Sequence, residues 1–339
     1  MLLDTKKEKM KEILNHLFEY KTLGEKDAEA VLSEITGGKY SDAEIAAFIT
    51  VFNMRTITIE ELSGFRNALL KSAVPVDFSA YQTIDLCGTG GDGKDTFNIS
   101  TLSAFVVAGS GSLVAKHGNY GASSGCGSSN VMEYLGYRFS NNEEKLKHEL
   151  ESCGITFLHA PLFNPAMKNV APVRRALRLK TFFNMLGPMV NPSRPKNQIV
   201  GVFSMELARM YNYLYQRSDV NYTIVHTLDG YDEISLTGPF KLQSRLSEQI
   251  LSPASLGLPQ LQAAELAGSG DIPGTAAIFT AVLHGKGTDA QNSAVVANSA
   301  MAIRTIRPEL SVEDAVETAR QSLLGGQALK VFNRLIALQ

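Results

Sequence analysis

Apolar residues recur at three- and four-residue intervals through the first part of the chain, a pattern typical of amphipathic helices. Ser41 and Thr58 each stand just before such a segment and have a glutamate three positions later, which is the spacing of a capping box. We therefore predict an all-helical domain over residues 1–72. Its helices are expected at residues 6–20, 25–36, 42–55 and 59–72.

The pattern changes after the Pro-containing connection that follows residue 72. Short apolar runs, each followed by a Gly-rich turn or a helical pattern, predict α/β architecture for residues 73–339. The expected strands are residues 83–87, 112–117, 155–160, 198–203 and 222–228. From about residue 275 helical periodicity returns, and these helices either flank the sheet or close back on the N-terminal domain. They are expected at residues 276–285, 289–306 and 312–338.

Composition narrows the range of partners. With 32 basic and 34 acidic residues, the formal charge of -2 gives no electrostatic basis for binding nucleic acid or an anionic membrane. Cys87, Cys126 and Cys153 are too scattered for a disulfide framework or a metal knuckle, which favours free thiols in a reducing compartment. No run of about 18 apolar residues occurs. We expect a cytoplasmic protein whose partners are small molecules.

The strongest local motif is the glycine-rich turn at residues 88–93, directly after the first predicted strand. Its backbone amides can approach an anion closely, and the hydroxyl-rich segment at residues 96–101 then opens a helix whose amino end favours phosphate. The spacing fits neither a Walker loop nor a dinucleotide-binding loop. A phosphorylated ligand is indicated, with an ordinary strand-to-helix turn as the alternative.

A second turn, at residues 116–129, combines a cation, glycines and hydroxyls after the next strand. Loops at the carboxyl ends of neighbouring strands face one crevice, so the two turns are expected to converge on one polyanion. Lys116 would supply a point charge. The alternatives are an exposed surface lysine and, for His117, a structural hydrogen-bonded histidine.

Adjacent carboxylates stand at Asp232 and Glu233, just beyond the last predicted strand. Mg²⁺ binds phosphorylated substrates through one or two carboxylates and several waters, which favours a magnesium site here. The alternative is a pair of solvated acids, the usual state of paired acids in turns. Arg174 lies in a proline-rich, apolar stretch and suits an aromatic carboxylate, with a surface ion pair as the alternative. For the Met and Phe residues around it, ordinary core packing is favoured.

Taken in order, these motifs closely resemble those of anthranilate phosphoribosyltransferases. The shared motifs are GTGGD at 88–92, NIST at 98–101, KHGN at 116–119, PAMK with VR at 165–174, LGP with NP at 186–192 and DEIS at 232–235. The resemblance implies a small helical domain plus a larger α/β domain with a central, mostly parallel sheet, as in nucleoside phosphorylases. It also implies homodimers that associate through the helical domain, and transfer of phosphoribose from phosphoribosyl pyrophosphate to anthranilate in tryptophan biosynthesis.

The resemblance also implies roles for individual residues. Anthranilate would contact Gly88, His117, Asn119, Arg174 and Pro188. Two Mg²⁺ ions would be held by Ser100, Asp232 and Glu233. Phosphoribosyl pyrophosphate would be held by Gly88, Gly91, Asp92, Thr96, Asn98, Ile99, Ser100, Thr101, Lys116, Ser124 and Ser128. No residue is assigned as a catalytic acid or base, and Lys116 and His117 assist at most.

Some positions depart from the family pattern. These are Tyr120, Asn130, Asn164, Arg178 and Lys180, and at Arg178 a glycine is expected that serves the backbone. None of them removes a predicted ligand.

Two other functions compete with this hypothesis. A nucleoside phosphorylase of the same fold also brings ribose, phosphate and a flat ring together, but the DEIS and PAMK motifs disfavour it. A catalytically silent relative that binds nucleic acid would need positive charge, which the overall balance does not provide.

Overall fold

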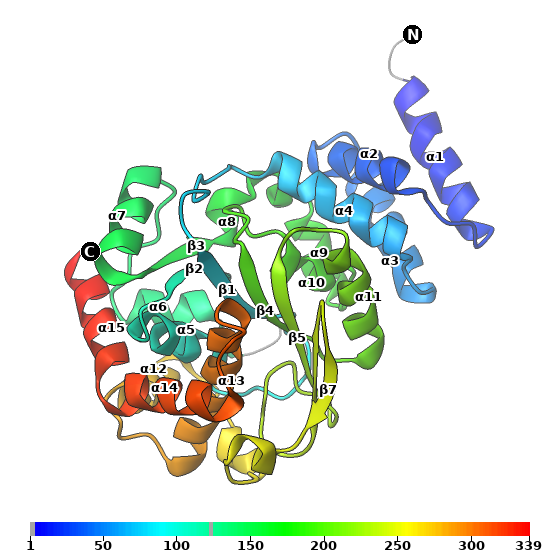
Figure 1. Ribbon diagram of the computed structural model, residues 1–339. Coiled ribbons are helices and arrows are strands. Elements are labelled where there is room, and N and C mark those ends of the chain that lie inside the picture. Colours follow the sequence, from blue (N-terminus) through cyan, green and yellow to red (C-terminus); the bar gives the residue numbers. More distant parts are fainter. Residues whose placement is uncertain (1–3, 122–124) are drawn as a thin grey trace. The chain divides into compact units, whose positions relative to one another are not determined.

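The computed structural model describes residues 4–121 and 125–339 (Figure 1). The chain forms two compact units. The helical unit comprises Met1–Pro75 and Pro161–Pro192, and the α/β unit comprises Val76–Ala160 and Ser193–Gln339. The sequence pattern predicts a single boundary at residue 72, with residues 161–192 in the α/β domain. In the structure these residues group with the helical unit instead, and the tail helices belong to the α/β unit.

Aromatic packing explains why residues 161–192 join the helical unit. The Phe182 ring stacks on Phe65 with 4.6 Å between ring centroids, and it meets Phe52 edge-on at 5.2 Å. Phe182 and Phe183 are buried, so ordinary core packing was the correct expectation for them. The elements of this unit are α1 (Asp4–Phe18), α2 (Glu25–Thr36), α3 (Asp42–Met54), α4 (Ile59–Ser72), α8 (Ala160–Phe163), α9 (Ala171–Leu177), α10 (Phe183–Leu186) and the 3₁₀ turns Pro165–Asn169 and Gly187–Met189.

Both predicted capping boxes are present. The Ser41 hydroxyl accepts a hydrogen bond from the amide of Glu44 at 3.4 Å, and the Thr58 hydroxyl accepts one from the amide of Glu61 at 3.2 Å. Arg178, where the family pattern has glycine, ends α9 in the left-handed region with φ +53°. Glycine adopts that conformation without strain, whereas arginine does not.

Glu61 also forms a buried ion pair, in addition to its role in the capping box. Its fully buried carboxylate accepts hydrogen bonds from the Arg55 guanidinium at 2.5 and 2.9 Å, and from the amides of Leu23 and Thr58 at 2.9 Å. Removing one partner of a buried ion pair leaves the other uncompensated. We expect Glu61→Ala to lower the free energy of unfolding by about 3–5 kcal/mol, measured by urea denaturation at pH 7.

The contribution of Glu61 to the free energy of unfolding should depend on pH in a defined direction. Burial raises the pKa of Glu61, but hydrogen bonds from Arg55 and the backbone outweigh it, so the folded pKa is lowered. A lowered carboxyl pKa contributes stability above the unfolded value of about 4.3, and this contribution is lost as pH falls through the folded pKa. The stability difference between the native chain and Glu61→Gln should therefore shrink in acid; a constant difference would contradict the assignment.

The α/β unit is built on a seven-stranded sheet in the order β3-β2-β1-β4-β5-β6-β7. Strands β1 to β5 pair in parallel, and β6 and β7 add antiparallel, which agrees with the expected mostly parallel sheet. The five predicted strands are β1 (Thr83–Gly88), β2 (Leu113–Gly118), β3 (Ile155–His159), β4 (Asn197–Gly201) and β5 (Asn221–Thr227). The antiparallel hairpin of β6 (Phe240–Ser244) and β7 (Glu248–Leu251) was not predicted.

The strand order reverses between β1 and β4. From β1 the chain proceeds through α5 (Ile99–Gly109) to β2 on one side, and from β4 it proceeds through α11 (Met205–Gln216) to β5 on the other. Right-handed crossovers in opposite directions place such helices on opposite faces and leave a crevice beyond the carboxyl ends of the two central strands. A ligand site is expected at the ends of β1 and β4.

The core of the α/β unit lies between the sheet and two apolar helices. Helix α5 packs on β1 and β2, and α13 (Asp289–Ile306) packs on β4, β5 and α5 (Figure 1). The predicted helix at 312–338 is divided at Gly326, whose φ of +76° separates α14 (Val312–Leu324) from α15 (Gln327–Ala337). The remaining helices are α6 (Ser128–Tyr134), α7 (Glu143–Cys153), α12 (Ile272–Leu283) and the 3₁₀ turns Pro253–Leu256 and Ala263–Leu266.

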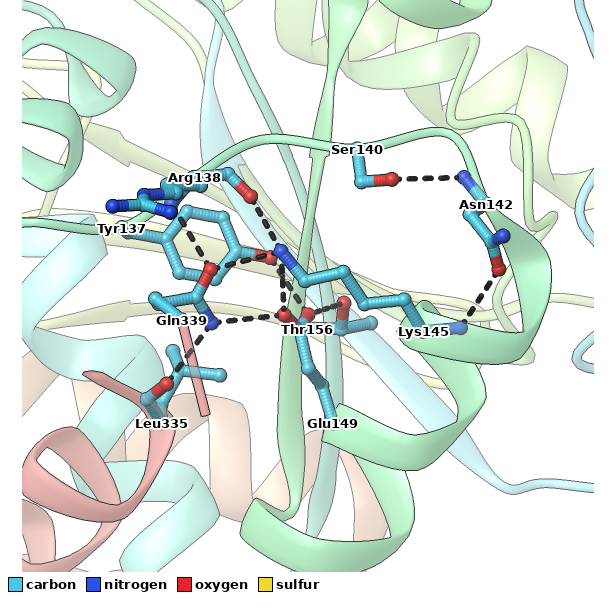
Figure 2. A network of polar contacts seen from close by, with 9 residues as sticks. All are labelled: Tyr137, Arg138, Ser140, Asn142, Lys145, Glu149, Thr156, Leu335 and Gln339. Atoms are coloured by element: carbon cyan, nitrogen blue, oxygen red, sulfur yellow. Dashed lines mark hydrogen bonds and ion pairs between the residues drawn. The ribbon is translucent and has the colours of Figure 1, made fainter. Parts of the chain in front are cut away.

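A buried carboxylate on α7 links β3 to the residue that follows α15, Gln339 (Figure 2). Glu149 accepts hydrogen bonds from the hydroxyls of Tyr137 and Thr156, both at 2.7 Å, and from the Gln339 side chain at 3.1 Å. The Lys145 Nζ atom lies 3.5 Å from Glu149 Oε1 and supplies the opposite charge. The charge is thus paired and hydrogen-bonded, as burial requires.

None of the helices in the described part of the chain combines the length and the apolar character needed to cross a membrane.

Candidate active site

The site begins with two glycines at the ends of the central strands. Gly88 ends β1 and Gly201 ends β4, and the two are paired in the sheet. A Cβ atom on Gly88 would collide with the carboxylate of Asp232, and one on Gly201 would collide with its backbone oxygen. The missing side chains therefore allow the turn that carries Asp232 to lie directly against the strand ends, at the point where the sheet order reverses.

Hydrogen bonds hold both acids to the glycine-rich turn and to the start of α5. Asp232 Oδ2 accepts from the amide of Gly90 at 2.6 Å. The two oxygens of Glu233 accept from the Ser100 amide at 3.0 Å and from the Thr96 hydroxyl at 3.1 Å. The structure thus brings the Asp232–Glu233 turn against the glycine-rich turn and the hydroxyl-rich segment that follows it, two motifs that were identified separately in the sequence.

The surroundings of the two carboxyl groups disfavour their negatively charged forms. Burial, followed by the charges of Glu233 and Asp92, raises the pKa of Asp232 well above its usual range. Burial and the charge of Asp92 raise the pKa of Glu233 to about 7, against the opposing effect of nearby Lys116. A cation at this position would relieve the repulsion between them. A cavity of about 20 Å³, lined partly by Ser100, Asp232 and Glu233, lies beside them.

The turn at 88–93 has the conformation expected of an anion cradle. Gly90, Gly91 and Gly93 have φ values of +64°, +78° and +75°, which side-chain-bearing residues rarely adopt. Within the described residues, buried Asn98 Oδ1 and Thr101 Oγ1 find no hydrogen-bond partner. Because buried polar atoms are normally paired, a polar ligand at the start of α5 would account for them.

Lys116 and His117 lie near the carboxyl end of β2, next to β1, and both are buried. Lys116 is 2% exposed, so the alternative of a solvent-exposed lysine is wrong. Its ammonium group donates to the Leu86 carbonyl and lies 3.4 Å from the Ser100 hydroxyl. The His117 amide donates to Asp85 at 3.0 Å, which anchors the end of the strand. Burial lowers the pKa of Lys116, opposed by the charge of Asp85.

The two glycine-rich turns converge, as expected. The Asn98 side chain donates to the Cys126 carbonyl at 3.2 Å, and the Gly125 amide donates to Asp95 at 3.3 Å. In the second turn the Ser128 hydroxyl donates to the Asn119 carbonyl at 3.3 Å. Ser124, also predicted to bind substrate, lies outside the described residues.

Arg174 and Pro188 belong to the helical unit. The Arg174 guanidinium lies over the Phe183 ring, 5.1 Å from its centroid, and burial lowers its pKa. Pro188 is buried in the 3₁₀ turn Gly187–Met189. The guanidinium can pair with a carboxylate, and the aromatic and apolar residues beside it can pack against a ring. This combination suits an aromatic carboxylate.

Sequence reasoning missed the residues that hold the acidic turn in place. Asn298 of α13 bonds the amide and the carbonyl of Ile234 at 3.0 and 2.9 Å, and the Thr227 hydroxyl donates to the Glu233 carbonyl at 2.6 Å. Gly201 was also missed. Asn298 itself was an available signal, because it stands in the mostly apolar middle of α13, where a buried amide needs partners.

Comparison with known proteins decides the family. Residues 80–329 match the family described as "Glycosyl transferase family, a/b domain", and residues 11–73 match "Glycosyl transferase family, helical bundle domain". The chain is 58% identical to the anthranilate phosphoribosyltransferase of Christiangramia forsetii, over 96% of this chain and 98% of the relative. The corresponding enzyme of Flavobacterium johnsoniae is 56% identical over the same shares.

The chain belongs to the anthranilate phosphoribosyltransferase family.

Solved structures of this family share the fold. An anthranilate phosphoribosyltransferase from Thermus thermophilus matches with a TM-score of 0.89 and 31% identity, covering 96% of this chain and 98% of the other. The Saccharomyces cerevisiae enzyme in complex with PRPP and Mg matches with a TM-score of 0.91 and 25% identity, covering 97% of each chain. The sequence resemblance and the expected α/β fold with a helical N-terminal domain are confirmed.

Proposed function

We propose that the chain transfers the 5-phosphoribosyl group of phosphoribosyl pyrophosphate to the amine of anthranilate, giving N-(5-phosphoribosyl)anthranilate and pyrophosphate, the second step of tryptophan biosynthesis from chorismate. The observation that carries the proposal is the meeting of the glycine-rich turn, the start of α5 and the Asp232–Glu233 turn at the point where the sheet order reverses. Membership of the family supports it, since the yeast relative was solved with PRPP and Mg.

Phosphoribosyl pyrophosphate would lie along the first turn and the start of α5. The backbone amides of the turn and the amino end of α5 suit phosphate oxygens, and Lys116 adds a buried positive charge. The residues proposed for this role are Gly88, Gly91, Asp92, Thr96, Asn98, Ile99, Ser100, Thr101, Lys116 and Ser128.

The acidic turn fits magnesium. Asp232, Glu233 and the Ser100 hydroxyl offer the hard oxygen donors that Mg²⁺ prefers, and the raised carboxyl pKa values are those of anions that lack a compensating charge. Mg²⁺ that binds with a phosphorylated substrate keeps waters and phosphate oxygens among its ligands, so one or two carboxylates are enough. We propose two ions. Bound Mg²⁺ would neutralise charge on the departing pyrophosphate.

Anthranilate would be bound through its carboxylate and its ring. Arg174 would pair with the carboxylate, Pro188 would provide apolar surface, and Gly88, His117 and Asn119 would complete its contacts. An aromatic amine attacks C1 of the ribose while neutral as pyrophosphate leaves, and becomes acidic only as the new bond forms. Its proton then passes to water or to pyrophosphate, so no strong protein base is required. The chain then contributes positioning and electrostatic stabilisation: Lys116 and the turn amides hold the leaving group in place.

Two properties complete the proposal. A homodimer associating through the helical unit follows from the family resemblance. A cytoplasmic location is supported by the three cysteines, which are all free thiols.

The activity is tested by following anthranilate fluorescence with phosphoribosyl pyrophosphate and Mg²⁺. We expect the fluorescence to decay with release of pyrophosphate, and EDTA to abolish the decay. Without a metal, the carboxylates of Asp232 and Glu233 would repel the negatively charged pyrophosphate group. A parallel reaction with nucleoside and phosphate, without added magnesium, should show no cleavage. Cleavage there, with no anthranilate consumed by folded protein, would replace the proposal with a nucleoside phosphorylase.

A further inference from the structure

His159 is a buried histidine that contacts two residues of the second glycine-rich turn, Tyr120 and Ser129. It ends β3 and is 5% exposed. Its Nδ1 lies 2.8 Å from the hydroxyl of Ser129, in the first turn of α6. Its ring meets the Tyr120 ring edge-on, with 4.7 Å between centroids, and stacks on Phe139 at 4.6 Å.

Each of the two turn contacts is one residue away from a proposed substrate ligand. Tyr120 follows Asn119, and Ser129 follows Ser128. The Ser129 amide and the Ser128 hydroxyl both donate to the Asn119 carbonyl, at 3.1 and 3.3 Å. A displacement of Ser129 would therefore move Asn119 as well as Ser128.

The support beneath these contacts is rigid. His159 pairs with Gly118 in the parallel ladder of β2 and β3, so its backbone is fixed by the sheet. Asn130 also holds this turn, because its Oδ1 accepts from the amides of Gly121 at 2.9 Å and Gly127 at 3.0 Å. Burial lowers the pKa of His159, opposed by the charge of Glu133, and a neutral ring can accept the Ser129 hydroxyl proton at Nδ1.

We propose that His159 is a positioning residue for substrate binding, which acts through Ser129 and Tyr120 to fix the separation of Asn119 and Ser128. It does not itself contact either substrate. The inference rests on the proposed function, because that function assigns Asn119 to anthranilate and Ser128 to phosphoribosyl pyrophosphate. Pre-set ligand positions reduce the ordering that binding requires, so their loss should appear in KM.

Two substitutions remove the same hydrogen bond from opposite sides. His159→Phe keeps an aromatic ring between Tyr120 and Phe139 but removes Nδ1, and Ser129→Ala removes the hydroxyl without changing the ring stack. We expect either change to raise KM for both substrates about three- to tenfold, the range of one hydrogen bond, with kcat within about twofold. The double variant should resemble the single ones, because both break one interaction.

Tyr137→Phe is the matched control. It removes another buried hydrogen bond of the same unit, to Glu149, and the ring that it alters also packs on Phe139. It should lower the thermal midpoint but leave KM unchanged. If His159→Phe does not fold, Ser129→Ala carries the test alone.

The outcomes separate the two proposals. An active native chain whose Ser129→Ala variant keeps native KM values, or raises them no more than Tyr137→Phe, overturns the positioning role only. A folded native chain without phosphoribosyl transfer overturns the proposed function and this inference with it.

Discussion

Replacing Asp232 and Glu233 together by alanine is expected to reduce turnover to the background rate at ordinary magnesium concentrations while the fold is retained. The two acids are the groups proposed to hold Mg²⁺, and the turn that carries them is fixed independently by Asn298 and Thr227. Loss of one preorganised electrostatic group typically reduces kcat by about 10²–10³, so the single variants Asp232→Asn and Glu233→Gln should already fall in this range. Steady-state kinetics across a magnesium titration measure the effect.

The control is Asp229→Ala, which removes an exposed acid three positions earlier in the same connection, bonded to Thr237. It should leave turnover and magnesium dependence unchanged. Near-native turnover of the Asp232 and Glu233 variants would refute the metal assignment, as would an equal loss in Asp229→Ala.

Although substitution of these acids should lower activity, it should make the folded chain less sensitive to rising pH. A carboxyl whose folded pKa is raised binds its proton more tightly in the native state, so stability falls as pH rises through that pKa, which is about 7 for Glu233. In EDTA the native chain should lose thermal stability as pH rises from the unfolded carboxyl pKa of about 4.3 to the folded value of about 7, and Glu233→Gln should lose less. A flat pH response of the native chain would contradict the raised pKa.

The sequence predicted those parts of the fold and site that depend on local order along the chain. Strands β1 to β5 follow from apolar runs between turns, and the turn at 88–93 follows from its glycines. The hairpin of β6 and β7 was not predicted because its connection, Arg245–Ser247, lacks the glycine or asparagine that marks a tight turn. Residues 161–192 were misplaced because the contact of Phe182 with Phe65 spans more than a hundred positions, which periodicity does not encode.

The same distinction applies within the site. Asp232 and Glu233 were weak candidates by themselves, since paired acids in turns are usually solvated. What distinguishes them is burial against Gly88, Gly201 and the start of α5, and these contacts depend on strand order. Lys116 likewise became informative only when its burial was known.

Gly201→Ala is expected to be the most damaging small substitution in the α/β unit. The new methyl group would overlap the backbone oxygen of Asp232, so the turn carrying both acids must move away from the strand ends. A displacement of about 1 Å in a positioned group can reduce the rate about a hundredfold, and overpacking costs about 1–3 kcal/mol of stability. Kinetics and urea denaturation of one preparation measure both effects.

The matched control is Gly238→Ala, in the connection that follows the acidic turn, where an added Cβ meets no atom within 4 Å. It should keep native turnover and stability. Because Gly201 is not proposed to contact a substrate, a loss of activity confined to Gly201→Ala would arise through the position of Asp232 and Glu233. Added magnesium should restore that activity only in part, since a higher concentration fills a distorted site without returning the carboxylates to their place. Native turnover in Gly201→Ala would show that the acidic turn moves without consequence, and the proposed need for close contact between this turn and the strand ends would be wrong.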